Sequence, residues 1–405
     1  MISRTSLIRA TTVLACVLAC LVVVSGCQTT KNLFKGKGGD KDPKPAKLVE
    51  FAPSATVSKL WSINVGKGEK SIGTRQHPAI ADGHVYAAAG LGGVDAIDLQ
   101  TGKVQWTYRP KERKDKKTTS FSGGPGVGSG LVVVGTLEGD VIALDQATGT
   151  EKWSGKLLNE ILAAPAIGNG VVVVHSNDGK VTAFDAATGE KRWTWSSEPV
   201  PLSVRGNSTP VIGPGYVFVG TDGGKLVALS LTDGGLLWET TVADADGRSD
   251  IARMNDSDGA PVMEGNVLYA SSYKPRTIAV DAPSGQLMWV QEHGGVGGIG
   301  ISSDRAVVSD SKDIVWGMDR NSGAPMWQQN GFTLRNISAP VVQGGYAVVG
   351  DYKGYLHWLK LADGQLAART RMTSKAIAAQ PVVSEDGVLV AQDIDGNIAA
   401  FRVSP

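Results

Sequence analysis

Side chains able to do chemistry are spread along this chain without the spacing that catalysis or metal binding requires. The five histidines share no metal-ligand spacing (His77, His84, His175, His293 and His357). The acidic run 244–250 places its glycine fourth, whereas a calcium-binding EF-hand loop needs it sixth and a glutamate twelfth. No serine or cysteine lies in a nucleophile motif. These residues predict neither a catalytic centre nor a metal site, and we expect no cofactor.

One covalent modification is predicted, at Cys27. Two arginines precede an apolar stretch, residues 10–24, that is too short for a membrane-spanning helix, and the sequence Val-Ser-Gly-Cys ending at Cys27 has the form of a bacterial lipobox. We expect removal of residues 1–26 as a lipoprotein signal peptide and acylation of Cys27, which would hold the chain on a membrane. The alternative is an ordinary secretory signal followed by a chance cysteine. Cys16 and Cys20 leave with the signal, so no disulfide is expected.

Two segments combine side chains that suit protein binding. Leu202 and Val204 alternate beside Arg205 in the first segment, and the second carries several carboxylates, including Asp256 and Asp258. Apolar side chains beside an arginine and a group of carboxylates are typical of a protein-docking patch. The alternative is a pair of solvated loops that turn Leu202 and Val204 inward. Together the two segments form a candidate partner-binding patch.

A repeated hairpin predicts how these segments are positioned. The thirteen residues 181–193, Val-Thr-Ala-Phe-Asp-Ala-Ala-Thr-Gly-Glu-Lys-Arg-Trp, recur with variations along the chain, and their shared glycines are about 44 residues apart (Gly102, Gly149, Gly189, Gly234, Gly285, Gly323 and Gly364). Each copy alternates like a strand, turns at Asp and Gly, and continues as a second strand that reaches Trp. A period of this length indicates a propeller or a solenoid.

A second hairpin phrase precedes each of these copies, which gives four strands per period. Counting this phrase gives eight blades, so we predict an all-β, eight-bladed β-propeller with four-stranded antiparallel blades. The strand around Trp61 lacks the first half of a repeat, and the last repeat, ending at Phe401, lacks its Trp strand. We therefore expect the N-terminal strand to complete the last blade and close the ring.

The sequence after the signal peptide predicts one closed domain preceded by a tether. Residues 27–56 are rich in lysine, glycine and proline and predict a lipidated flexible tether that spans about 30 Å root-mean-square, with the propeller occupying residues 57–405. The tether's lysines are either solvated or contact anionic lipid. The formal net charge of +1 indicates no class of partner, and we expect no nucleic-acid binding. The basic loop from Arg109 to Lys117 is interpreted as solvated.

The two candidate segments are connectors between blades. One links Trp193 to Pro210, and the other, the longest of its kind, links Trp238 to Pro261. Since they flank a single blade, we expect them to be neighbours on one face of the ring. Repeats with substitutions, such as Lys360 for Asp and Ala368 for Trp, are interpreted as local wear without functional meaning.

The repeat core Ala-x-Asp-x-x-Thr-Gly-x-x-x-Trp resembles the tryptophan-docking motif of pyrroloquinoline-quinone-type propellers. Together with the lipobox and the tether, the eight repeats resemble the BamB family of lipoproteins, which belong to the outer-membrane β-barrel assembly machinery. The resemblance implies a non-catalytic scaffold that binds the periplasmic domains of BamA, works with other components of the machinery and assists insertion of outer-membrane proteins. Unfolded outer-membrane proteins are a further candidate partner. Gln28 after the cysteine implies an anchor in the outer membrane, on its periplasmic face.

The same resemblance assigns the candidate residues to a partner-binding site. Family members have a Leu-x-Leu-Arg-Gly segment and an Asp-x-Asp segment on the surface that binds BamA; Leu202, Val204 and Arg205 match the first, with valine for the second leucine, and Asp256 and Asp258 match the second. Two other functions stay open: a quinone-dependent oxidoreductase of the same architecture, and a passive envelope-anchoring lipoprotein. Against the first, the cysteine pair common in such dehydrogenases is absent from the mature sequence.

Overall fold

The protein was analysed as a computed structural model, which describes residues 44–68, 75–110, 119–202, 206–244, 256–257, 259–295 and 297–405. The chain divides into two compact units, Met1–Lys44 and Pro45–Pro405, and every described strand lies in the second. Residues 1–26 and Cys27 lie outside the described residues. The sequence placed the start of the folded domain at residue 57; the second unit begins at Pro45, ahead of the first strand at Thr56.

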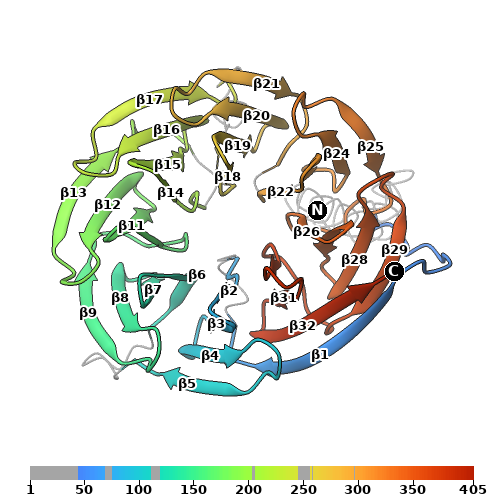
Figure 1. Cartoon of the computed structure of the whole chain (residues 1–405), viewed down its shortest axis with the longest axis horizontal. Helices are drawn as coiled ribbons and strands as arrows, with labels where there is room; N and C mark the ends of the chain where they lie inside the picture. Colours follow the sequence, from blue (N-terminus) through green and yellow to red (C-terminus); the bar gives the residue numbers. More distant parts are fainter. Residues whose placement is uncertain are drawn as a thin grey trace, which may run out of the picture. The chain divides into compact units, whose positions relative to one another are not determined.

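The described strands form eight four-stranded antiparallel sheets arranged as the blades of a ring (Figure 1). The predicted all-β, eight-bladed propeller is therefore confirmed. Blades 1 to 4 comprise β2 (Ala79–Ala81), β3 (His84–Ala88), β4 (Val94–Asp98) and β5 (Val104–Tyr108); β6 (Phe121–Gly128), β7 (Leu131–Thr136), β8 (Asp140–Asp145) and β9 (Glu151–Lys156); β10 (Ala166–Gly168), β11 (Val171–Ser176), β12 (Lys180–Asp185) and β13 (Lys191–Ser196); and β14 (Val211–Gly213), β15 (Tyr216–Gly220), β16 (Lys225–Ser230) and β17 (Leu236–Thr241).

The remaining blades follow in chain order. Blades 5 to 8 comprise β18 (Val262–Glu264), β19 (Val267–Ser272), β20 (Arg276–Asp281) and β21 (Leu287–Gln291); β22 (Ile299–Ile301), β23 (Arg305–Ser309), β24 (Val315–Asp319) and β25 (Pro325–Gln329); β26 (Val341–Gln343), β27 (Tyr346–Gly350), β28 (Tyr355–Lys360) and β29 (Leu366–Arg371); and β30 (Val382–Val383), β31 (Leu389–Gln392), β32 (Asn397–Ser404) and β1 (Thr56–Asn64). The described residues contain no helix long and apolar enough to cross a membrane.

The N-terminal strand closes the ring, as the sequence predicted. Strand β1 pairs antiparallel with β32 from Thr56 opposite Ser404 to Asn64 opposite Asn397, and it is the outer strand of blade 8 (Figure 1). The first and last segments of the propeller therefore share one sheet. This pairing protects two edges that would otherwise remain open to other chains.

The turn between the third and fourth strands of each blade carries the repeated Asp and Gly. In blade 3, one carboxylate oxygen of Asp185 accepts hydrogen bonds from the backbone N–H groups of Ala187 and Thr188, each at 2.9 Å. Gly189 then adopts φ +74°, in the left-handed region that glycine tolerates best. The Asp therefore satisfies the turn's backbone donors, and the Gly lets the chain reverse.

The same glycine receives the tryptophan of the preceding blade. A Cβ atom built on Gly189 would lie 2.6 Å from Cδ2 of Trp153, so the indole ring lies directly against the glycine. The indole N–H of Trp153 donates to the carbonyl of Ala186 at 2.9 Å. Equivalent indole hydrogen bonds connect neighbouring blades from Trp61, Trp106, Trp193, Trp238, Trp289 and Trp327. Tryptophan thus fills the space between blades, as expected from its position in the repeat.

The eighth interface, between blades 7 and 8, is built differently because Ala368 occupies the tryptophan position. Trp358, one strand further in on β28, is completely buried and donates its indole N–H to Gln343 at 2.7 Å. Gln343 in turn donates to the carbonyl of Phe401 in blade 8 at 3.1 Å. The interpretation of Ala368 as local wear is therefore corrected: a second tryptophan and a buried amide take over the connection between these blades.

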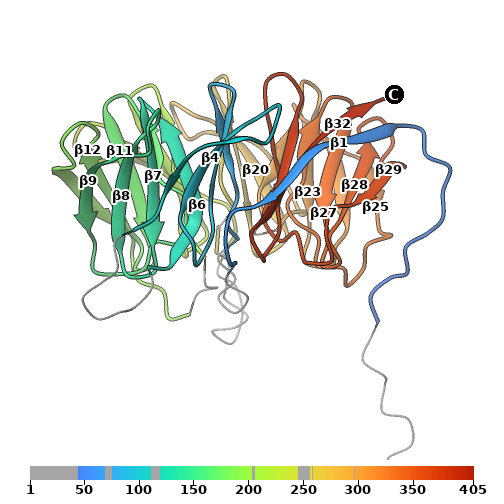
Figure 2. The ribbon, with the colours of Figure 1, turned by 90° about the horizontal axis from the view of Figure 1, so that it is seen from below.

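The antiparallel order of each blade assigns its loops to two faces of the ring, which Figure 2 shows from the side. The connectors that leave an outer strand for the next blade lie on one face, together with the turns between second and third strands. We call this the connector face. The remaining hairpin turns, including the Asp–Gly turns, lie on the opposite face. Long connectors therefore concentrate on one side of the propeller.

Replacing Gly189 by alanine should destabilise the protein more than replacing Gly170. Both glycines have nearly the same positive φ, +74° and +75°, but a Cβ at Gly170 meets no atom within 4 Å. Gly170→Ala should therefore lose only the backbone term of about 1–2 kcal/mol. Gly189→Ala must in addition displace Trp153, which we expect to add about 1–3 kcal/mol. Urea denaturation of both variants measures the difference; equal midpoints would contradict the role of the tryptophan contact.

Candidate functional site

The two candidate connectors meet on the connector face beside blade 4. They link β13 to β14 and β17 to β18, so they flank β14–β17 on both sides. The hydroxyl of Ser208 in the first donates to the carbonyl of Gly259 in the second at 3.4 Å. The N–H of Ser257 donates to the carbonyl of Thr221, in the turn between β15 and β16, at 3.1 Å. The expected proximity of the two connectors is therefore confirmed.

The first connector borders an open pocket of about 460 Å³. Leu202 is 43% exposed at the edge of this pocket. We call this cavity the Leu202 pocket. Its apolar lining comes from Trp195, Pro199, Val200, Pro201, Leu202, Val227 and Leu236. The rest of its lining comes from Ser196, Ser197, Glu198, Thr221, Asp222, Gly223, Lys225 and Glu239. Leu202 is thus available on the surface and does not turn into the core. Val204 and Arg205 lie outside the described residues.

Charge in the Leu202 pocket is mainly negative. Lys225 and Glu239 neutralise each other, since the lysine nitrogen lies 2.6 Å from a carboxylate oxygen. Glu198 and Asp222 add two further carboxylates to the lining. Burial, together with the neighbouring charge of Asp256, raises the pKa of Asp222 to about 6. The pocket therefore offers apolar walls and acidic groups to a partner.

Asp256 does not lie on the surface with Leu202. Its side chain is completely buried, and its backbone carbonyl accepts a hydrogen bond from the N–H of Tyr273 at 2.7 Å. The next residue, Ser257, donates its hydroxyl to the carbonyl of Ser271 at 3.0 Å. These contacts hold Asp256 against blade 5, beneath the surface. Its burial favours a supporting role over direct contact with a partner, whereas Asp258 lies outside the described residues.

Exposed charges surround the second connector where the structure describes it. Arg276 lies 3.2 Å from carboxylate oxygens of both Asp244 and Glu292. Lys274 donates to the backbone carbonyl of Asp244 at 2.8 Å. The side chain of Asp244 is 71% exposed, so its ion pair is screened by solvent. This part of the connector belongs to the rim of the patch.

The start of the basic loop is held by an ion pair. The guanidinium of Arg109 lies 2.9 Å from the carboxylate of Asp95, which is buried on β4. Asp95 also accepts a hydrogen bond from Thr107 at 2.8 Å. Residues 111–118 lie outside the described residues, so the interpretation of this loop as solvated stays a prediction for them.

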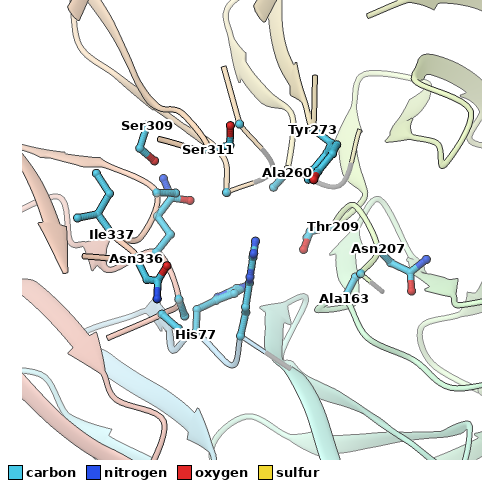
Figure 3. Close-up of a pocket in the computed structure, with 18 of the residues that line it drawn as sticks. His77, Ala163, Asn207, Thr209, Ala260, Tyr273, Ser309, Ser311, Asn336 and Ile337 are labelled. Atoms are coloured by element: carbon cyan, nitrogen blue, oxygen red, sulfur yellow. The ribbon is translucent and has the colours of Figure 1, made fainter. Parts of the chain in front are cut away.

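A second cavity, of about 410 Å³, lies at the centre of the ring (Figure 3). Connectors and turns from around the ring contribute to it, and many of its lining residues are glycine or alanine. His77, Thr209, Tyr273 and Asn336 lie around the opening in Figure 3. Burial lowers the pKa of His77, so its ring is neutral at pH 7. The charged residues of the described lining are Arg75, Asp310 and Asp313.

The carboxylates of this central cavity are already used by the backbone. Asp310 accepts hydrogen bonds from the N–H groups of Lys312 and Ile314 at 2.8 and 2.9 Å. Asp313 accepts from those of Asn336 and Ile337 at 3.1 and 2.9 Å. Among the described residues, no three His, Cys, Asp or Glu side chains are grouped as metal ligands. Within the described part of the cavity, the carboxylates of Asp310 and Asp313 therefore serve mainly to hold the loop backbone.

Sequence reasoning found Leu202 but missed the pocket beside it. Asp222 lies in the turn Thr221-Asp-Gly-Gly224, where turn chemistry accounts for every residue. Trp195 is two residues beyond the repeated Trp193 and has no counterpart in most repeats. Nothing in their spacing shows that the neighbouring connector folds over them. The unusual second tryptophan is the one signal that could have indicated an additional apolar surface here.

Comparison with known proteins identifies the family. Residues 113–329 match the family described as outer membrane protein assembly factor BamB. The chain is 56% identical to the outer membrane protein assembly factor BamB of Xanthomonas campestris pv. campestris over 386 residues, which cover 94% of this chain and 95% of that protein. The crystal structure of BamB from Moraxella catarrhalis matches with a TM-score of 0.76 and 26% identity, covering 86% of this chain and 100% of the other.

Enzymes of the same architecture are more distant. Quinohemoprotein alcohol dehydrogenase from Comamonas testosteroni matches with a TM-score of 0.66 at 16% identity, over 85% of this chain and 76% of the enzyme. This similarity shows a common propeller fold only. The sequence identity and the matched length point instead to the assembly factors. The chain belongs to the BamB family of outer membrane protein assembly factors.

Proposed function

We propose that this protein is a non-catalytic scaffold of the outer-membrane β-barrel assembly machinery, where it assists the insertion of outer-membrane proteins. The observation that carries the proposal is the 56% identity to an outer membrane protein assembly factor over 95% of that factor's length. BamA, through its periplasmic domains, is the proposed direct partner, alongside other components of the machinery. A lipid on Cys27 would hold the propeller at the periplasmic face of the outer membrane.

The docking surface supports binding as the main activity. The Leu202 pocket joins exposed apolar groups to carboxylates on the connector face, a combination that suits an apolar side chain followed by a basic one. Arg205 follows Leu202 by three residues, and a planar guanidinium can form paired hydrogen bonds with a carboxylate. Asp256 would support this surface from below. The central cavity, whose carboxylates serve the backbone, supports the inference that the protein is not an enzyme.

Replacing Cys27 by alanine should release the protein from membranes or leave its signal uncleaved. Acylation requires the thiol, and without acyl chains the propeller has no anchor. Fractionation of cells that express the variant measures this directly, with Cys20→Ala as the control because Cys20 belongs to the expected signal. A processed Cys27→Ala protein that stays on the membrane after a salt wash would contradict the lipid anchor.

Truncation of Arg205 should weaken binding to the periplasmic domains of BamA more than loss of a rim charge. A central anchor typically contributes about 2 kcal/mol or more, roughly thirtyfold in affinity, and Leu202→Ala should act in the same direction. Asp244→Ala, at the exposed rim, should change affinity by less than about 1 kcal/mol. Calorimetric titration of folded variants gives these affinities. Unchanged binding by both Arg205→Ala and Leu202→Ala would remove this surface from the proposal.

Asp222→Asn should stabilise the protein above pH 6. The pKa near 6 in the folded state lies above the ordinary aspartate value of 3.8, so the folded state holds more protons between these values and loses stability as the pH rises through them. Asparagine lacks this loss, so its advantage should be largest above pH 6 and vanish below about pH 4. Asp233→Asn is a control for which the pH-dependent change in stability should have the opposite sign, because a hydrogen bond from Ser230 lowers the pKa of Asp233. Urea midpoints across pH test both; a constant advantage for Asp222→Asn would contradict the shifted ionisation.

A further inference from the structure

Residues 45–55, which the sequence assigned to a free tether, run along the outer side of blade 7. Strand β29 has a bulge at Ala367, since Trp358 pairs with Ala368 and Leu359 with Leu366. The carbonyl of Ala367 faces outward and accepts hydrogen bonds from the N–H groups of Ser54 at 2.9 Å and Ala55 at 3.2 Å. A backbone group on the outer edge of the propeller is thus paired with the segment that precedes β1.

Two arginines hold the rest of this segment by its backbone. Arg369, in the middle of β29, donates to the carbonyl of Val49 at 3.1 Å and lies 5.2 Å from the ring centre of Phe51. Arg335, in the connector between β25 and β26, donates to the carbonyl of Ala46 at 2.9 Å, and the N–H of Ala46 donates to the carbonyl of Thr333 at 2.9 Å. The segment therefore runs antiparallel to β29 and reaches the connector face near its first residues.

Arg335 is oriented by contacts within the propeller that do not involve this segment. Its guanidinium lies against the completely buried Asp351, with Nε at 2.9 Å and Nη2 at 2.5 Å from one carboxylate oxygen, and His357 contacts the same oxygen at 3.0 Å. Burial alone would raise the pKa of Asp351, but the hydrogen bonds from His357 and Arg335 outweigh it and lower that pKa. The ionised carboxylate orients the guanidinium, whose Nη1 donates to the carbonyl of Ala46.

Blade 7 is suited to this contact because its side chains at the bulge are small. Other blades carry Gln105, Lys152, Arg192, Leu237, Met288 or Met326 at the position of Ala367. With alanine at both 367 and 368, Ala55 packs against blade 7 and is only 8% exposed, in one cluster with Trp358 and Phe401. The missing tryptophan of this blade therefore coincides with the place where the preceding segment docks.

We propose that residues 45–55 are a docked strap, bound by Ala367 and Arg369 of blade 7 and by Arg335 of the connector before it. The strap makes the chain leave the propeller on the connector face, where the proposed partner surface lies. Docking takes eleven residues out of the predicted tether. A tether shortened in this way would span about 23 Å root-mean-square as a random chain, in place of about 30 Å. A lipid on Cys27 would therefore hold the propeller with its connector face toward the membrane; this consequence, unlike the docking, rests on the lipid anchor of the proposed function.

Hydrogen–deuterium exchange of the mature chain tests the docking itself. The amides of Ala46, Ser54 and Ala55 should exchange at least about tenfold more slowly than in a free peptide of the same sequence. The combined variant Ser54→Pro with Arg369→Ala removes one backbone donor and one clamp but leaves Arg335 and Asp351 in place. It should abolish the protection of Ala55 and weaken that of Ala46, which keeps its own bonds to Thr333 and Arg335. Arg371→Ala is the matched control, because Arg371 on the same strand donates to Lys353 and not to the strap. Peptide-like exchange in the unaltered chain overturns the proposal.

The orientation is tested on vesicles of the lipidated protein with single fluorophores. Leu158→Cys, 93% exposed between β9 and β10, places a label on the connector face, and Ala187→Cys places one on the opposite face. Quenchers in the lipid headgroups should quench the first label more than the second, and the strap variant should reduce this difference while Arg371→Ala preserves it. Equal quenching of both labels in the unaltered chain, or an undiminished difference in the strap variant, overturns the proposed orientation. Binding of BamA's periplasmic domains by unlipidated protein in solution is a separate readout, so loss of the proposed function would not be mistaken for failure of the strap.

Discussion

The structure depends on a contact between neighbouring blades, in which a tryptophan ring lies on the turn glycine of the next blade. The ring excludes any side chain at that glycine, and its N–H satisfies a carbonyl that the turn leaves free, as at Trp153 and Ala186. One interaction therefore combines apolar burial, a hydrogen bond and a backbone constraint. Because each blade packs mainly on its two neighbours, the stability of the ring depends on such contacts repeated around it.

The interface between blades 7 and 8, beside the point where the ring closes, differs from the others. Strand β1 comes from the start of the chain and β32 from its end, so blade 8 can form only when both termini of the propeller meet. The adjacent interface with blade 7 lacks the repeated tryptophan and relies on Trp358, Gln343 and Phe401. Its indole hydrogen bond is to a side-chain amide and not to a turn carbonyl. The departure from the repeat therefore falls beside the blade that closes the ring.

The fold could be predicted from the sequence because its causes are local and repeated. The Asp–Gly turns, the strand alternation and the tryptophan spacing specify a hairpin within thirteen residues, and their period specifies the number of blades. The site was harder to predict because it depends on contacts between connectors. Leu202 was recognised by its type and neighbours. The burial of Asp256 follows from its backbone bond with Tyr273 and from the bond of Ser257 to Thr221, which no local pattern contains. For residues 45–55, lysine and proline predict a solvated tether, whereas the hydrogen bonds of this segment to the propeller use its backbone atoms, which composition does not reveal.

The residue at the bulge of each outer strand determines whether an additional segment can bind to the edge of that blade. The bulge brings a backbone carbonyl to the outer edge of each blade that has it, so the side chain at that position decides access. Lys152 and Arg192 lie 3.1 and 2.6 Å from the turn aspartates Asp145 and Asp185, which places charged groups over the edges of blades 2 and 3. Ala367 leaves the equivalent carbonyl uncovered, and Ser54 and Ala55 bind it. A small residue at the repeated bulge therefore distinguishes the blade edge that binds an additional segment from the edges that charged side chains cover.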